Sequence, residues 1–186
     1  MSICTKKYYY TERERKMQIP QNAGLTGFNG ILDTFLSELS EILPHINKIK
    51  DVRKGLQMMT SSNSVTIKKK PLQMFMNAVT PYKDLVKAED EVLMTTFIKD
   101  ISFFKGMNIT EEWGKFDADQ KQGMWKYLNL LTDMGGALIQ IPDSMFPMLD
   151  RFTQQLANNP EIMEGMLRDM GGMMPGGSSN QGYLKD

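Results

Sequence analysis

Few side chains in this 186-residue chain have the chemistry of a catalyst. The chain contains one histidine, His45, and one cysteine, Cys4. A nucleophilic site needs a base beside its nucleophile, and the usual zinc sites need several His or Cys ligands. Neither a G-x-x-x-x-G-K-[ST] phosphate loop nor a G-x-G-x-x-G fingerprint occurs in the sequence. We therefore predict no catalytic residue, no metal site, no cofactor and no enzymatic activity.

Acidic side chains gather in two places along the chain. Glu89, Asp90 and Glu91 are consecutive, and Glu111 precedes Glu112. Carboxylates can hold Mg²⁺, but consecutive residues of a helix point in different directions. We interpret both groups as helix starts or solvated faces.

Basic side chains gather between residues 48 and 70, where Asp51 is the one acidic residue. A surface of this kind can contact phosphates. The side chains that we expect to do so are Lys50, Arg53, Lys54, Lys68, Lys69 and Lys70. They lack an aromatic platform and a helix-turn-helix pattern, and Lys plus Arg equals Asp plus Glu at 22 each over the chain. Binding of nucleic acid is therefore our second hypothesis.

The composition, 41% apolar and 24% charged, is that of a soluble globular domain. No apolar run approaches the roughly 18 residues that a membrane span needs, and no secretory signal opens the sequence. A single cysteine allows no internal disulfide, which fits a reducing compartment. We expect an intracellular protein without a membrane span.

Apolar residues recur at steps of three and four, which predicts amphipathic helices. The expected helices cover residues 28–43, 44–60, 71–97 with an interruption at Pro81, 110–116, 118–134 and 143–157. We expect Pro71 to open its helix after a short extended piece, and Gly135-Gly136 to end the helix that Asp117 and Gln120 start with a capping box. Trp125 is expected in the core of this fold.

With no strand pattern and no repeat, the sequence predicts an all-α fold. We expect a single irregular helical bundle over residues 27–157 with disordered N- and C-terminal tails. The flanking segments are a flexible one over residues 1–26, a Met-rich helix over 158–171 and a Gly/Ser tail over 172–186.

The Met-rich helix is the expected binding surface. The chain has 17 methionines, whose flexible side chains fill irregular cores or line adaptable binding surfaces. The expected partner-binding residues form one helical stripe: Ile162, Met163, Met166, Leu167 and Met170. We predict that this stripe binds a protein partner or a second copy of the chain.

Three stretches in order resemble a family of small helical proteins of nucleocytoplasmic large DNA viruses. They are "FNGILDTFLSELSEILP", "PLQMFMNAVTPYKDLVKAEDEVLM" and "MWKYLNLLTDMG". The matching positions are Phe28, Asn29, Phe35, Leu39, Pro44, Phe75, Val79, Pro81, Tyr82, Asp90, Glu91, Trp125, Lys126, Tyr127 and Leu128. The resemblance implies viral origin and a place in the virion, the virus factory or the host cytoplasm.

A second resemblance concerns "LANNPEIMEGMLRDMGGMMPGG". This stretch is similar to the Asn-Pro- and Met-rich helical modules of co-chaperones and ubiquilins, which cradle apolar segments. The resemblance implies a chaperone-type binder of apolar segments. Our first hypothesis remains a non-enzymatic interaction or structural protein.

Overall fold

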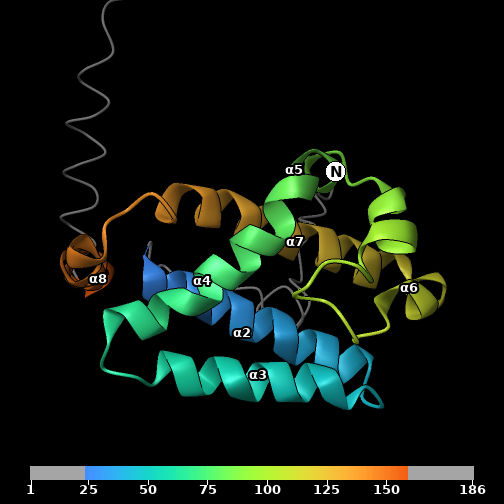
Figure 1. Ribbon diagram of the computed structural model, residues 1–186, viewed down its shortest axis with the longest axis horizontal. Helices are drawn as coiled ribbons and strands as arrows, with labels where there is room; N and C mark the ends of the chain where they lie inside the picture. Colours follow the sequence, from blue (N-terminus) through green and yellow to red (C-terminus); the bar gives the residue numbers. More distant parts are fainter. Residues whose placement is uncertain (1–23, 159–186) are drawn as a thin grey trace, which may run out of the picture.

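The computed structural model describes residues 24–158, which form a bundle of α-helices joined by short turns (Figure 1). No strand occurs among these residues, and the predicted all-α class is confirmed. The α-helices are α2 (Leu25–Ile42), α3 (Asn47–Thr60), α4 (Val65–Val79), α5 (Lys83–Lys87), α6 (Ile109–Glu112), α7 (Ala118–Leu138) and α8 (Phe146–Asn158). The 3₁₀ turns η1 (Thr80–Tyr82), η3 (Trp113–Lys115) and η4 (Asp143–Met145) lie between α4 and α8, and residues 88–108, which include the π-helix η2 (Leu93–Phe97), join α5 to α6.

Helix α2 is the centre of the bundle and contacts α3, α4, α7 and α8. Its apolar residues follow the helical repeat, so one side of the helix is fully buried. Phe28 meets Phe75 of α4 with ring centroids 6.0 Å apart, and Phe35 meets Tyr127 of α7 at 5.4 Å. These aromatic pairs join three helices from distant parts of the sequence.

Trp125 is a core residue, as predicted, with 5% of its surface exposed. Its ring meets the ring of Trp113 edge-on, with centroids 5.8 Å apart. The capping box at the start of α7 is also confirmed. The Asp117 carboxylate accepts from the Gln120 backbone N–H at 2.7 Å, and the Gln120 side chain accepts from the Asp117 N–H at 3.0 Å.

The prediction of an extended piece before Pro71 is wrong. Helix α4 begins at Val65 and carries Pro71 in its interior. A proline there removes one backbone hydrogen bond of the preceding turn. The carbonyl that loses its partner is that of Ile67, and the adjoining Lys68 carbonyl accepts from the Asn29 side-chain amide of α2 at 3.0 Å.

The prediction that Gly135-Gly136 ends α7 is also wrong, because the helix continues to Leu138. A Cβ atom added at Gly135 would clash with the sulfur of Met76 and lie 3.3 Å from a ring carbon of Phe28. Gly135 thus lets α7 approach α2 and α4 closely.

Residues 83–97 do not form the continuous helix that the periodicity predicted. The chain turns after α5, and Glu89 takes a left-handed backbone conformation with φ of 50°. The turn is tied to α7 from both directions, because Lys87 pairs with Asp133 and the Asn129 amide donates to Glu89 at 3.3 Å. The second helix likewise begins at Asn47 rather than at Pro44.

Candidate interaction surface

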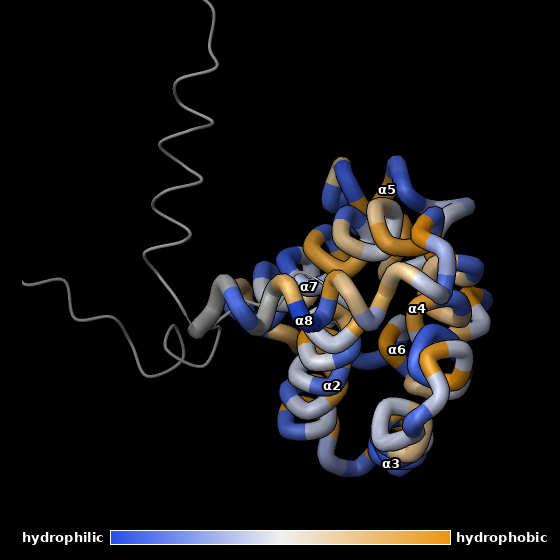
Figure 2. The backbone as a smooth tube through the Cα atoms, turned by 90° about the vertical axis from the view of Figure 1, so that its left-hand side faces the viewer, coloured by the Kyte–Doolittle hydropathy of each residue, from blue (hydrophilic) through white to orange (hydrophobic). Residues whose placement is uncertain are grey.

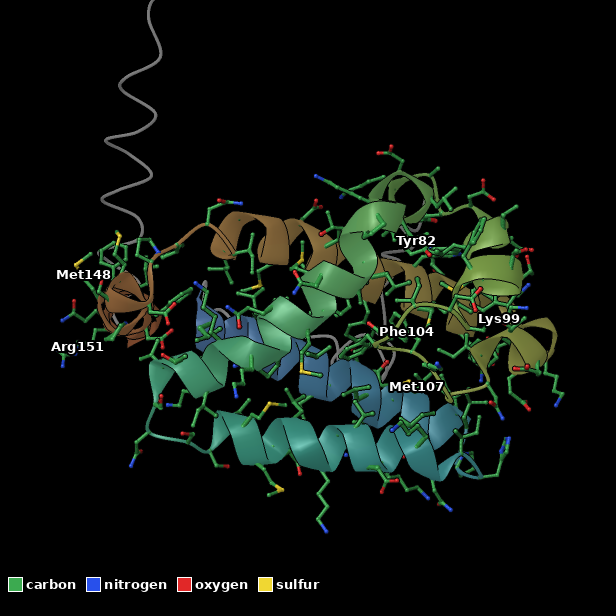
Figure 3. All side chains as sticks on the ribbon, viewed as in Figure 1. Tyr82, Lys99, Phe104, Met107, Met148 and Arg151 are labelled. Atoms are coloured by element: carbon green, nitrogen blue, oxygen red, sulfur yellow. The ribbon has the colours of Figure 1, made fainter. Side chains whose placement is uncertain are left out.

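Helix α8 presents an unusual row of exposed apolar side chains. Met145, at the end of η4, is 42% exposed, Met148 is 61% exposed and Phe152 is 43% exposed. Their spacing of three and four residues places them on one side of the helix. We call these three residues the α8 stripe. Figure 2 faces this helix, and Figure 3 shows Met148 and Arg151 on its outer side.

The side of α8 that carries Phe146 packs against the bundle. Phe146 is completely buried, and the Lys69 ammonium of α4 lies 5.1 Å from the centre of its ring. The same ammonium donates to the Ile141 carbonyl at 2.8 Å and to the Asp143 carboxylate at 3.0 Å. Near the middle of α8, the Thr26 hydroxyl donates to Asp150 at 3.1 Å.

These contacts shift the titration of Asp143. The hydrogen bond from Lys69 lowers the pKa of the Asp143 carboxyl, and the hydroxyl of Thr66, which donates at 3.2 Å, lowers it further. Burial opposes both effects. The carboxylate is therefore the form that links α4 to η4.

Lys69, one of the predicted phosphate contacts, is buried between α4 and η4. The residue is 7% exposed, and its ammonium donates to the Ile141 carbonyl and the Asp143 carboxylate. A lysine in this position links α4 to the connection between α7 and α8.

Arg53, a second predicted phosphate contact, forms a two-pronged ion pair with Asp33 of α2. Both of its nitrogen-to-oxygen distances are 3.0 Å. Gln57 donates to the same carboxylate at 3.1 Å, so Asp33 joins α2 to α3 twice. The Arg53 guanidinium therefore joins α3 to α2.

The remaining predicted phosphate contacts lie at or near the surface. Lys50 is exposed but donates to the Pro44 carbonyl at 2.9 Å. Lys54 and Lys70 are exposed, and Lys68 is half-buried. Lys54 is on α3, and the other two are near the start of α4. The basic stretch of the sequence is therefore divided between buried or paired groups and separate surface lysines.

The titratable groups near the N-terminus of α3 form a small surface network. His45 is 61% exposed and lies 3.4 Å from the Glu112 carboxylate. The ammonium of Lys115 holds the pKa of Glu112 below its usual value, with a smaller contribution from His45. Over residues 24–158, no group of three or more His, Cys, Asp or Glu side chains is arranged to hold a metal ion.

Tyr127 is the buried titratable group of the core. Its hydroxyl donates to the Glu38 carboxylate at 2.8 Å. Burial is the larger cause and this hydrogen bond the smaller one, and together they raise the pKa of the phenol well above its usual value. The phenol stays protonated at neutral pH and links α7 to α2.

The partner-binding residues predicted from the sequence lie outside the described residues. These are Ile162, Met163, Met166, Leu167 and Met170. The α8 stripe was not singled out from the sequence, which predicted a helix over residues 143–157 without saying which of its apolar side chains would be exposed.

No family model, no curated protein and no solved structure matches this chain. Within residues 24–158, no helix has the length and apolar character required to cross a membrane.

Proposed function

We propose that this chain is a non-enzymatic interaction protein that binds an apolar segment of a partner through the α8 stripe and the Met-rich segment after it. One observation carries the proposal: Met145, Met148 and Phe152 stand exposed in a row on a helix whose other edge is anchored. Exposed apolar side chains are common singly, whereas a row of them is typical of a binding surface.

The chemistry of the stripe fits an amphipathic helix as its ligand. Apolar anchors three and four residues apart match the side chains that such a helix presents. Methionine adapts to ligands of imprecise shape, because its unbranched side chain has several rotatable bonds. Covering the three half-exposed side chains contributes about 3 kcal/mol, or roughly a hundredfold in a binding constant.

The proposed setting is viral. The resemblance in residues 28–138 supports a virion- or virus-factory-associated protein, located in the virion or the host cytoplasm. Detection of the chain in purified virions would support this setting, and its absence from virions and virus factories would contradict it.

The stripe is tested by affinity capture with the full chain and two variants. We expect Met148→Glu combined with Phe152→Glu to lose a partner that the wild-type chain captures. The matched control is Met58→Glu, because Met58 is 72% exposed on α3, away from α8. Equal capture by all three chains would overturn the proposal, provided that their melting temperatures agree.

Nucleic-acid binding is the second candidate, and the exposed positions of Lys54 and Lys70 favour it. A phosphate-contacting surface gives binding that weakens steeply with salt. Nuclease treatment during capture separates the candidates, since a partner held by the α8 stripe survives it. Lys54→Gln with Lys70→Gln should reduce DNA binding only if the second candidate is correct.

A further inference from the structure

The two charged side chains of α8 lie on different sides of the helix. Asp150 accepts from the Thr26 hydroxyl of α2 at 3.1 Å, so its carboxylate faces the bundle. Arg151 is exposed, and Figure 3 shows it with Met148 on the outer side of α8. Because Arg151 follows Met148 by three residues, the two side chains are neighbours on the helix surface. The α8 stripe is therefore bordered on its outer edge by a positive charge.

Helix α4, which packs against η4 at the start of α8, adds to this charge. It contains three lysines and no acidic residue. Lys69 pairs with Asp143, whereas the next residue, Lys70, is exposed. Within residues 24–158, neither Lys70 nor Arg151 forms an ion pair. The corner that α4, η4 and α8 form thus carries positive charge that no carboxylate neutralises.

The acidic residues of the same corner already have partners. Asp143 accepts from Lys69 at 3.0 Å, and Asp150 accepts from Thr26. Because α4, η4 and α8 contain no further carboxylate side chain, a ligand that covers the α8 stripe meets cations at its polar edge. Charges at the rim of an interface favour a partner of opposite sign and repel one of the same sign. The corner is therefore suited to a ligand with carboxylates beside its apolar face.

We propose that the ligand of the α8 stripe is an acidic amphipathic helix. Its apolar side chains cover the stripe, and its carboxylates lie against Arg151 and Lys70. The inference rests on the proposed function, because it names the charge of the ligand that the stripe binds. It adds a selectivity that the apolar contact does not provide, since methionine accepts apolar ligands of many shapes.

Two synthetic peptides test this selectivity with the full chain. Both are amphipathic helices with leucine at the same apolar positions, and their polar positions carry glutamate in one peptide and lysine in the other. We expect the chain to bind the glutamate peptide about tenfold more tightly at low salt, because the two cations attract one peptide and repel the other. In about 1 M salt, where the screening length falls to about 3 Å, the two affinities should become nearly equal. Fluorescence anisotropy of the labelled peptides measures both.

Charge reversal assigns the selectivity to this corner. Lys70→Glu combined with Arg151→Glu should invert the preference, so that the lysine peptide binds more tightly. The matched control is Lys54→Glu with Lys99→Glu, which changes the net charge equally. Both control residues are exposed, Lys54 on α3 and Lys99 at the end of the bundle opposite α8 (Figure 3). An inversion of the same size in the control would show that net charge decides, and would overturn the inference.

The remaining outcomes separate this inference from the proposed function. Equal binding of the two peptides by the wild-type chain at low salt would overturn the inference and leave the proposed function standing. Binding of neither peptide would overturn both. Tighter binding of a duplex DNA than of the glutamate peptide would assign the corner to nucleic acid. Loss of peptide binding as the chain dimerises would assign the stripe to a second copy.

Discussion

At the scale of single residues, glycine and tryptophan show how closely the bundle is packed. A Cβ atom added at Gly135 would meet Met76 and Phe28, while one added at the next residue, Gly136, would enter open space. Trp125 and Trp113 share an edge-on contact in the core. The two glycines therefore differ in role although they are adjacent in the sequence.

We expect Gly135→Ala to lower the free energy of unfolding by about 1–3 kcal/mol, because the added methyl group overpacks the junction of three helices. Gly136→Ala is the matched control. It should be neutral or stabilising by up to about 1 kcal/mol, since alanine favours helix. Urea unfolding of both variants measures the difference, and equal stabilities would contradict the role of Gly135.

Trp125→Ala should destabilise the bundle by about 3–5 kcal/mol, because it removes a large side chain from a close-packed core. The measurement is again urea unfolding, followed by intrinsic fluorescence of Trp113. A variant of unchanged stability that had lost a binding activity would show that Trp125 serves function instead of packing.

At the scale of elements, α8 is attached to the bundle by a few specific contacts rather than by a broad apolar face. Lys69 reaches from α4 to the turn before α8, and Thr26 reaches from α2 to α8. Asp143 remains 45% exposed, so its charge stays hydrated if Lys69 is removed. The attachment of α8 is therefore separable from the stability of the whole bundle.

Lys69→Met should loosen α8 without unfolding the bundle, since methionine keeps the packing against Phe146 but donates no hydrogen bond. We expect faster amide hydrogen exchange in α8 and unchanged exchange in α2. Lys70→Met, at the exposed neighbouring position, is the control and should change neither. Loss of protection throughout the bundle would show that Lys69 stabilises the entire fold.

The same contact predicts an acid-sensitive attachment. Lys69 lowers the pKa of Asp143 in the folded protein. The stabilisation of α8 by this ion pair is therefore complete above about pH 3.8, the ordinary pKa of the carboxyl group. It is lost as the pH falls through the lower, folded pKa. Protection factors in α8 should drop over this acidic range, and Asp143→Asn should remove that part of the drop. An unchanged profile in the variant would show that Asp143 does not cause the acid response.

At the scale of the whole molecule, the hydrophobic periodicity was enough to predict the class and most of the helices. Local signals were also sufficient to predict where a helix begins, as the capping box at Asp117 does for α7. Pro71 and Gly135 were misread. Pro71 lies inside α4 although prolines favour the first turn of a helix, and Met76, from another helix, fills the space beside Gly135.

The surface was harder to predict than the fold. Lys69 looks like its neighbours Lys68 and Lys70 in the sequence, and only the position of Asp143, far along the chain, draws it inward. The α8 stripe escaped detection for a related reason. Periodicity identifies an apolar face but does not tell how much of its width the rest of the molecule covers.

Removal of residues 159–186 should leave the bundle folded, since its core lies within residues 24–158. The melting temperature should change by less than about 4 °C. Partner capture should weaken if the removed segment shares in binding. Unfolding of the truncated chain would place the removed segment in the core.

The meeting of α2 and α8 has a mechanical consequence (Figure 1). The described chain enters the bundle at Gly24 and leaves it along α8, and the Thr26–Asp150 hydrogen bond joins these two places. An opposed pull on the two ends therefore loads this junction first, while the helices between them carry little tension. A filament or anchor built on both ends would strain the α2–α8 contact and peel α8 away, exposing the remainder of its apolar face under force.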